Sequence, residues 1–455
     1  MIGILLLAIG IISYILRFKK LSLFIFFTFM LKGWVVLTDD VIGQKNYDLA
    51  FVYTFVILIY SCMFERASTP IYDKRIHKWL YIFLVFLVLS IMFSYNHYGF
   101  TPYQILQGSR ASFLFLSFFF LRKTRAKDLW WLNETFFYIT LITSVLYILE
   151  VFFDLHLLPY DISKLKVDEY TGINRYYNSP PLLYWYIFAT ILTPHLIKSR
   201  LTFISIFIFG LALIATLGRT QIAMTTGVVL LGLVWQGKAR SIFSALAVAL
   251  LLVAPFADTI SARFTGQFEN STESDVRSIF NGGIEQTVRA GNTYDVGNLT
   301  FRLAWVYERA QYLQDRPISE NIYGLGLISD SQVLTVHKHY SFMIGLLDDD
   351  NNIWQLGTPD ISYGNILTKY GYVGGILFLM IWIALLSTFF KYRNQDDLAF
   401  VGFLLLVDYF LLGFSGTIIS DQGNMVFPFT IFLLIDHKVA THSLTKKPRE
   451  IQDEN

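Results

Sequence analysis

The chain has almost no cysteine and little charge for its length. Of its 455 residues only Cys62 is a cysteine, and it lies inside an apolar run. One cysteine cannot form a disulfide within the chain, so the polar parts must be held by packing and hydrogen bonds. Charged residues make up 15% of the chain, against roughly 25% in soluble domains, which argues against an ordinary soluble protein. The net charge is only +2, and we expect no nucleic-acid partner.

Apolar residues are abundant instead: they form 54% of the chain, aromatic residues form 17%, and the mean hydropathy is +0.49. Apolar runs recur at a length that suits the hydrocarbon core, which about 20 helical residues cross. We therefore predict an all-α polytopic protein with the lipid bilayer as its surroundings and about thirteen transmembrane helices. The predicted spans are 2–16, 21–38, 49–64, 79–95, 104–121, 129–153, 181–197, 201–217, 221–235, 241–257, 365–390, 398–418 and 425–436. No basic segment precedes the first, so it is predicted to be retained and not cleaved as a signal.

Basic residues occupy every second connection. Examples are Arg17, Lys19 and Lys20 after the first span, and Lys391 and Arg393 after the eleventh. Basic residues near span ends stay in the cytoplasm, so the alternate connections are predicted to lie outside. With an odd number of spans, the N-terminus is then outside and the C-terminus cytoplasmic.

One long polar segment interrupts the apolar pattern. Residues 258–364 are rich in charged residues, Asn, Gly and Ser. We predict an N-terminal bundle of about ten spans (1–257), a large, mostly helical outer loop (258–364), C-terminal transmembrane helices (365–436) and a cytoplasmic tail (437–455). Loops on a rigid scaffold often carry function, so we expect chemistry at the outer membrane surface.

Arg219 is the single charge in the run 201–235. Either one over-long helix carries it, or two short spans meet at a tight outer hairpin with Arg219 at its apex. An arginine at membrane depth usually faces a partner or a wet cavity, and its planar guanidinium suits a phosphate. We favour an anion site, and the alternative is an arginine that reaches to the interface.

Residues 298–315 are predicted to form an amphipathic helix that Pro317 ends. Arg302, Arg309 and Arg316 are spaced seven residues apart, which stacks them roughly on one face. We favour Arg302, in the first turn, as a functional group. For Arg309 and Arg316 we favour a solubilising role within the helix, in which Arg309 pairs with Glu308 or Asp315.

Two further outer positions are candidates. Arg175 lies in a Gly/Asn/Pro-rich turn before the seventh span and places a cation at the outer rim. Asp360 precedes the eleventh span and could serve as a general base or as a helix cap.

The outer segment also contains residues of the types that bind metals, but their spacing does not predict a metal site. The acidic run 348–352 could hold a divalent cation, but its spacing fits no standard loop and a solvated turn is favoured. His337 and His339 lack a third clear ligand, so no metal site and no cofactor are predicted. Within the membrane, Lys369 and Asp408 are predicted to pair.

These features resemble the O-antigen polymerase and O-antigen ligase superfamily, which has many spans and one large outer loop before the last few. The matching elements are Arg175 with Asn178-Ser179-Pro180, then Gly218-Arg219-Thr220, then Arg302-Leu303-Ala304-Trp305 with Gly324-Leu325-Gly326, and Asn365-Ile366-Leu367 with Gly371 and Gly374-Gly375. The ligase branch carries a histidine just before the span after the loop, where this chain has Asp360-Ile361-Ser362-Tyr363. The resemblance therefore favours a polymerase.

The resemblance implies a fold similar to the C-type glycosyltransferases, a bacterial inner membrane and an undecaprenyl-diphosphate-linked glycan as substrate. Arg219, Arg302 and Arg175 would bind the diphosphate, and Asp360 would accept a proton in an inverting transfer. Trp305 and Tyr363 would stack on sugar rings. A chain-length regulator is a candidate partner. The alternatives are a ligase or protein-glycosylating enzyme of the same superfamily, and a non-catalytic transporter of lipid-linked glycans.

Overall fold

The computed structural model describes residues 2–65, 73–159, 166–167, 174–176, 179–197, 199–238, 272–291, 297–347, 352–358 and 360–450. At 166–167, 174–175, 272, 274 and 442–450 the backbone alone is described. The predicted span 241–257 lies outside the described residues.

Helices make up nearly all of the described secondary structure, which confirms the predicted helical class. Four of them are long and apolar enough to cross a membrane: α4 (Asn46–Phe64), α5 (Arg75–Tyr98), α8 (Ala126–Phe153) and α19 (Ser362–Tyr392). This is therefore a membrane protein. The only strands in the described part of the chain are β1 (Lys166–Val167) and β2 (Asn174–Arg175), an antiparallel pair of two residues each.

Further helices complete the apolar bundle. They are α1 (Ile2–Ile15), α2 (Lys19–Met30), α9 (Leu183–Leu192), α10 (Thr202–Ala215), α11 (Arg219–Trp235), α20 (Asp397–Leu412) and α21 (Gly423–Glu450), with short helices α3 (Asp39–Ile42) and η4 (Pro194–Leu196) between them. Most side chains of α20 are buried, because α9, α11, α19 and α21 all pack against it. The core around it is strongly aromatic and includes Trp185, Trp382 and Phe378.

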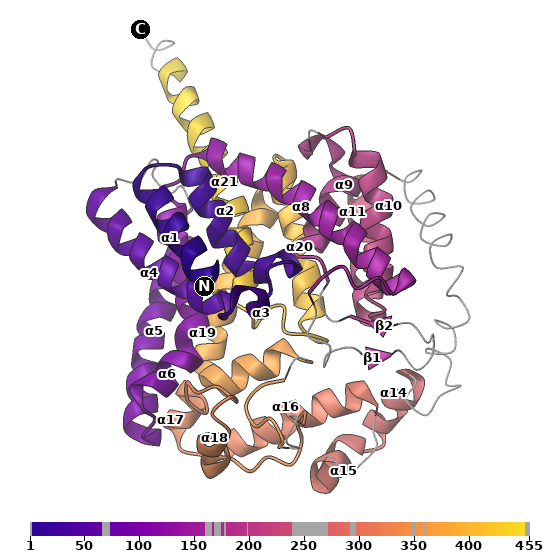
Figure 1. Cartoon of the computed structure of the whole chain (residues 1–455). Coiled ribbons are helices and arrows are strands. Elements are labelled where there is room, and N and C mark those ends of the chain that lie inside the picture. Colours follow the sequence, from indigo (N-terminus) through magenta and orange to yellow (C-terminus); the bar gives the residue numbers. More distant parts are fainter. Residues whose placement is uncertain are drawn as a thin grey trace.

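The described part of the polar segment is mostly helical, as predicted. It contains α14 (Thr272–Phe280), α15 (Gly283–Ala290), α16 (Asn298–Gln314), α17 (Ile318–Tyr323) and α18 (Val333–His339). Figure 1 shows these helices as a layer against one end of the apolar bundle, and we call it the outer layer because it lies outside that bundle. The contacts of α16 and α17 with α19 attach this layer to the bundle.

Two predicted spans are shorter than expected. The run 21–38 divides into α2 and η1 (Lys32–Val35), because Gly33 and Trp34 adopt left-handed backbone angles. The run 104–121 divides into α6 (Pro102–Ser109), η2 (Arg110–Leu116) and α7 (Ser117–Leu121). Its first part packs on the outer layer, where Gln104 Nε2 donates to Thr335 Oγ1 at 2.8 Å. Hydropathy alone missed this contact because it averages these polar side chains with their apolar neighbours.

The hairpin predicted around Arg219 is confirmed. α10 ends at Ala215 and α11 begins at Arg219, with Leu217 at φ 51° in the turn between them. A single over-long helix is thus excluded. The positive φ reverses the chain within three residues.

A glycine pair joins the outer layer to α19. Gly371, at φ 67° and ψ −169°, breaks α19, and Gly324 packs into the break at φ 79°. A Cβ added to Gly324 would lie 2.6 Å from the Gly371 nitrogen, so the backbones approach too closely for any side chain. The Leu325 N–H donates to the Thr368 carbonyl at 2.8 Å beside it. The Gly-x-Gly element noted in the sequence therefore has a packing role here.

Candidate functional site

Arg302 and Asp360 meet where the outer layer joins α19. Arg302 lies in the first turns of α16, and its Nη2 is 3.7 Å from Asp360 Oδ1. Their side chains are 19% and 32% exposed, so both remain partly accessible. The structure thus brings together two residues that are 58 positions apart and were predicted as a cation and a base of one site.

Asp360 does not cap α19. The N-cap residue is Ile361, and no side chain makes a capping hydrogen bond there. The backbone N–H of Asp360 instead donates to Thr358 Oγ1 at 3.2 Å. Of the two roles considered for Asp360, the cap is wrong, and its carboxylate faces the guanidinium of Arg302.

The turn that carries Asp360 is held on both sides. Asn365 brackets Thr358: its Oδ1 accepts from the Thr358 N–H at 2.9 Å, and its Nδ2 donates to the Thr358 carbonyl at 2.6 Å. Ser362 Oγ donates to the Gly416 carbonyl at 2.6 Å, which ties the start of α19 to the segment that follows α20. A carboxylate on such a clamped turn has a defined position, which a general base requires.

Tyr363 and Trp305, predicted to stack on sugars, lie in different environments. Tyr363 is half-buried, its hydroxyl donates to the Phe410 carbonyl at 2.7 Å, and its ring packs on Phe414. Trp305 is 0% exposed: Gly364 lies against one edge of its indole, and the Arg309 guanidinium lies 4.1 Å from its ring centroid. A fully covered ring cannot stack on a ligand, so we correct the sugar-binding assignment of Trp305 to a packing role.

Arg219 lies toward the same end of the bundle as Asp360. It is the first residue of α11, and six residues later the Thr225 hydroxyl donates to Asp408 of α20 at 3.2 Å. Six helical residues rise about 9 Å. Trp235, at the far end of α11, packs on Phe403, so α11 runs antiparallel to α20. The start of α11 therefore points toward the C-terminal end of α20. Ser362 and Tyr363, at the start of α19, lie beside that same end.

Two predicted features lie wholly or partly outside the residues that the structure describes. Arg175 lies in β2, where its backbone pairs with Lys166, and its side chain is outside the described residues. Most of the acidic run 348–352 is outside them as well. Among the residues that are described, no group of three His, Cys, Asp or Glu could hold a metal ion.

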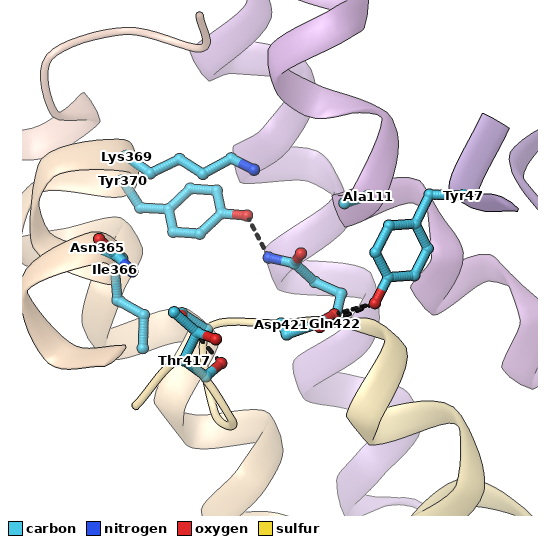
Figure 2. Close-up of a pocket in the computed structure, with 10 residues that line it drawn as sticks. Tyr47, Ala111, Asn365, Ile366, Lys369, Tyr370, Thr417, Asp421 and Gln422 are labelled. Carbon is cyan, nitrogen blue, oxygen red and sulfur yellow. Dashed lines mark hydrogen bonds between the residues drawn. The ribbon is translucent and has the colours of Figure 1, made fainter. Parts of the chain in front are cut away.

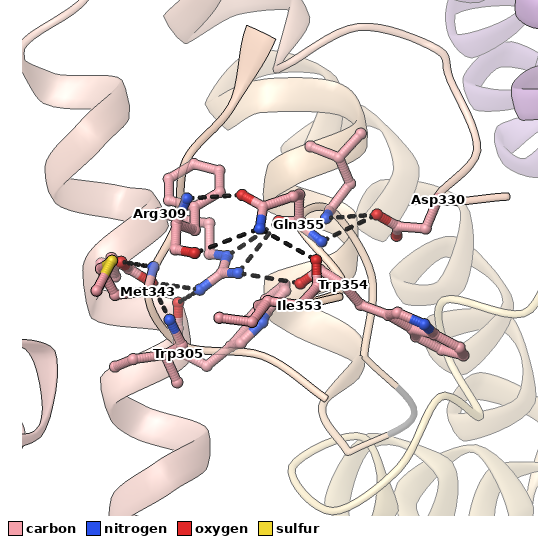
Figure 3. A network of polar contacts seen from close by, with 11 residues as sticks. Trp305, Arg309, Asp330, Met343, Ile353, Trp354 and Gln355 are labelled. Atoms are coloured by element: carbon pink, nitrogen blue, oxygen red, sulfur yellow. Dashed lines mark hydrogen bonds and ion pairs between the residues drawn. The ribbon is translucent and has the colours of Figure 1, made fainter. Parts of the chain in front are cut away.

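Arg309 forms the centre of a buried polar network (Figure 3). Its guanidinium is 0% exposed and lies between the rings of Trp305 and Phe342, at 4.1 and 4.4 Å from their centroids. Its Nη1 donates to Glu308 Oε2 at 2.6 Å, and its Nη2 donates to the Gln355 carbonyl at 3.1 Å. Burial lowers the pKa of Arg309 to about 9, so it stays charged at neutral pH. The predicted pair with Glu308 is confirmed, but its arginine is buried and not solvated.

Asp330 and Gln355 extend this network into the loop before α19. Asp330 Oδ1 accepts from the Gln355 and Leu356 N–H groups, both at 3.0 Å, and burial raises the pKa of Asp330. Gln355 Oε1 accepts from the Phe342 N–H at 2.6 Å. Sequence reasoning missed both residues, because nothing in a polar loop marks a single Asp or Gln as part of such a network. The network supports the loop that leads to Asp360.

The predicted ion pair between Lys369 and Asp408 is wrong. Asp408 accepts from Thr225 on α11. Lys369 precedes the break at Gly371 and lines a cavity instead (Figure 2). The backbone break redirects this part of α19, which a straight helix drawn from the sequence could not include.

That cavity has a volume of about 320 Å³. It is lined by Tyr47, Ala111, Asn365, Ile366, Lys369, Tyr370, Thr417, Ser420, Asp421 and Gln422. Tyr47 Oη donates to Asp421, 2.8 Å from each carboxylate oxygen, and Gln422 Nε2 donates to Tyr370 Oη at 3.0 Å (Figure 2). Sequence reasoning missed this cavity. Its one signal was the polar run 420–422 between two apolar segments.

No protein-family model matches this chain, and a search of curated proteins found no match. The functional argument therefore depends on the geometry of the chain itself.

Proposed function

We propose that this protein is an inverting glycosyltransferase that polymerises lipid-linked oligosaccharide repeat units. It would transfer a growing glycan from undecaprenyl diphosphate to the non-reducing end of another lipid-linked unit. The supporting observation is the Arg302–Asp360 pair, partly exposed at the junction of the outer layer with α19. In one site, such a cation can bind a phosphate leaving group while the neighbouring carboxylate accepts a proton.

In this proposal Arg302 and Arg219 bind the lipid diphosphate, and Arg175 contributes from the outer rim. Negative charge develops on the diphosphate as the glycosidic C–O bond breaks, and guanidinium groups stabilise it where it appears. The acceptor hydroxyl attacks the anomeric carbon from the opposite face and forms the new C–O bond. Asp360 accepts the proton of that hydroxyl, and the diphosphate leaves with the electron pair of the broken bond. The configuration at the anomeric carbon is inverted.

The proposal includes the topology expected from the charge pattern. The chain would cross a bacterial inner membrane about thirteen times, with the N-terminus in the periplasm, the C-terminus in the cytoplasm and residues 258–364 on the periplasmic side. A chain-length regulator is the proposed protein partner.

The direct test is elongation of a lipid-linked repeat unit by the purified full-length protein in nanodiscs. Wild type should produce a ladder of longer products, and Arg302→Ala and Asp360→Asn should produce no detectable ladder in the same reaction time. Arg289→Ala is the matched control, because Arg289 is exposed on α15 and should leave the ladder unchanged.

An Arg302→Ala protein that elongates at the wild-type rate would overturn the proposed site. Transfer of finished glycan to lipid A or protein, without elongation, would instead indicate a ligase or a protein-glycosylating enzyme. Movement of the lipid-linked unit across the membrane with no transfer would indicate a transporter.

A further inference from the structure

The cavity of Figure 2 contains a lysine that the Arg302–Asp360 site does not use. Lys369 makes no hydrogen bond or ion pair with any described residue, and its Nζ lies 5.5 Å from the centroid of the Tyr370 ring. An ammonium group has three donors and is strongly hydrated. A lysine that lines a cavity without an acceptor is suited to an anionic ligand that supplies one.

The same cavity holds a carboxylate with room to accept. Asp421 accepts from the Tyr47 hydroxyl and, at 3.0 Å, from the Gly423 N–H. A carboxylate has about four acceptor positions, so capacity remains for a ligand hydroxyl. Lys369 and Asp421 are the charged side chains in the lining of this cavity. Arg110, which pairs with Asp48, is also within electrostatic range of Lys369 but is not part of the lining.

This combination discriminates between ligand classes. Inorganic phosphate would satisfy Lys369 but would place its negative charge near Asp421. A neutral sugar could donate hydroxyls to Asp421 but would leave Lys369 without a charged acceptor. A sugar that carries a carboxylate supplies both groups. At about 320 Å³ the cavity is at the small end of ligand sites, which suits a single ring.

The cavity is also connected to the proposed reaction site. Asn365 and Lys369 are four residues apart on α19 and both line the cavity. Asn365 in turn brackets Thr358, whose hydroxyl holds the Asp360 N–H. A sugar bound at Lys369 would therefore lie on the helical face that continues from the turn of Asp360.

We infer that this cavity binds a hexuronic-acid residue of the glycan, with its carboxylate on Lys369 and a ring hydroxyl donating to Asp421. This inference rests on the proposed function, and it assigns an acidic sugar to the repeat unit that the protein uses.

The test measures binding of three probes, glucuronate, glucose and inorganic phosphate, to the full-length protein in nanodiscs by titration calorimetry or saturation-transfer NMR. Glucuronate should bind about tenfold more tightly than either other probe, as expected for one charge-assisted contact. Lys369→Met should abolish this preference, and Lys369→Arg should retain most of it. Asp421→Asn should weaken binding of glucuronate and glucose alike.

Lys338→Met is the matched control, because Lys338 is exposed on α18 and should change nothing. Equal binding of glucuronate and glucose by wild type would overturn the inference, and so would tighter binding of phosphate. Both outcomes are read on the wild-type protein, so they do not depend on whether Lys369→Met folds.

Failure of the proposed function can be distinguished from failure of this inference. Arg302→Ala should leave glucuronate binding intact while it removes elongation. Selective glucuronate binding by a wild-type protein that elongates nothing would retain the acidic-sugar site and reject the polymerase.

Discussion

Arg302 Nη2 lies 3.7 Å from Asp360 Oδ1, across the junction between α16 and the start of α19. The distance is longer than a strong charge-assisted hydrogen bond, and both side chains are partly exposed. The pair therefore leaves each group able to exchange its partner for a ligand.

If Arg302 stabilises the leaving diphosphate, Arg302→Ala should lower the elongation rate by roughly 100- to 1,000-fold, as for loss of one electrostatic donor. Arg302→Lys should recover part of the rate, because it restores the charge without the planar fork. Single-turnover kinetics with a lipid-linked repeat unit measures both. Both variants should melt at the same temperature as wild type. If the elongation rate falls only to the extent that the melting temperature falls, Arg302 has a structural role instead.

Arg309 should matter for stability and not for chemistry. Arg309→Met removes the charge that faces Glu308 and the donors to the Gln355 carbonyl, and should destabilise the outer layer by about 3–5 kcal/mol. Denaturant melts of the protein in detergent, followed by proteolysis of the outer segment, measure this. Arg277→Met on exposed α14 is the control and should have little effect. Equal melts for the two variants would contradict the structural role.

Gly324→Ala should separate the outer layer from α19. The new Cβ would meet the Gly371 nitrogen at 2.6 Å and the backbone would also be strained at φ 79°, for a cost of roughly 1–3 kcal/mol or more. Gly282→Ala provides the comparison, since Gly282 has φ 81° but no atom within 4 Å of the added Cβ. Thermal melts should rank Gly324→Ala well below Gly282→Ala. Similar melting temperatures would show that the glycine contact is unimportant.

Asp330 should give a measurable pH dependence. Burial raises its pKa in the folded protein, so the charged form costs stability above that pKa. As the pH falls from the raised pKa toward the ordinary value of about 3.9, the folded state binds more protons and the cost disappears. Asp330→Asn should therefore melt higher than wild type at neutral pH, with the gap closing in acid. A gap that widens in acid would refute this assignment.

Much of the fold was predictable, because a long apolar run must be removed from water whatever its position in the sequence. The four long helices follow from such runs, and the turn before Arg219 follows from a single charge in one of them. The breaks within 21–38 and 104–121 could not be predicted, since they depend on backbone angles at Gly33 and on packing of α6 against α18.

For the site, the sequence alone selected Arg302 and Asp360 as residue types suited to a phosphate and a proton. It determined a helical membrane protein with one long polar segment, because composition and periodicity are properties of the chain. Tertiary structure decided that these two residues meet, that Trp305 is covered, and that Lys369 enters a cavity and not a pair with Asp408. The physical reason is that burial and charge pairing depend on contacts between segments far apart in the chain, which no local pattern encodes.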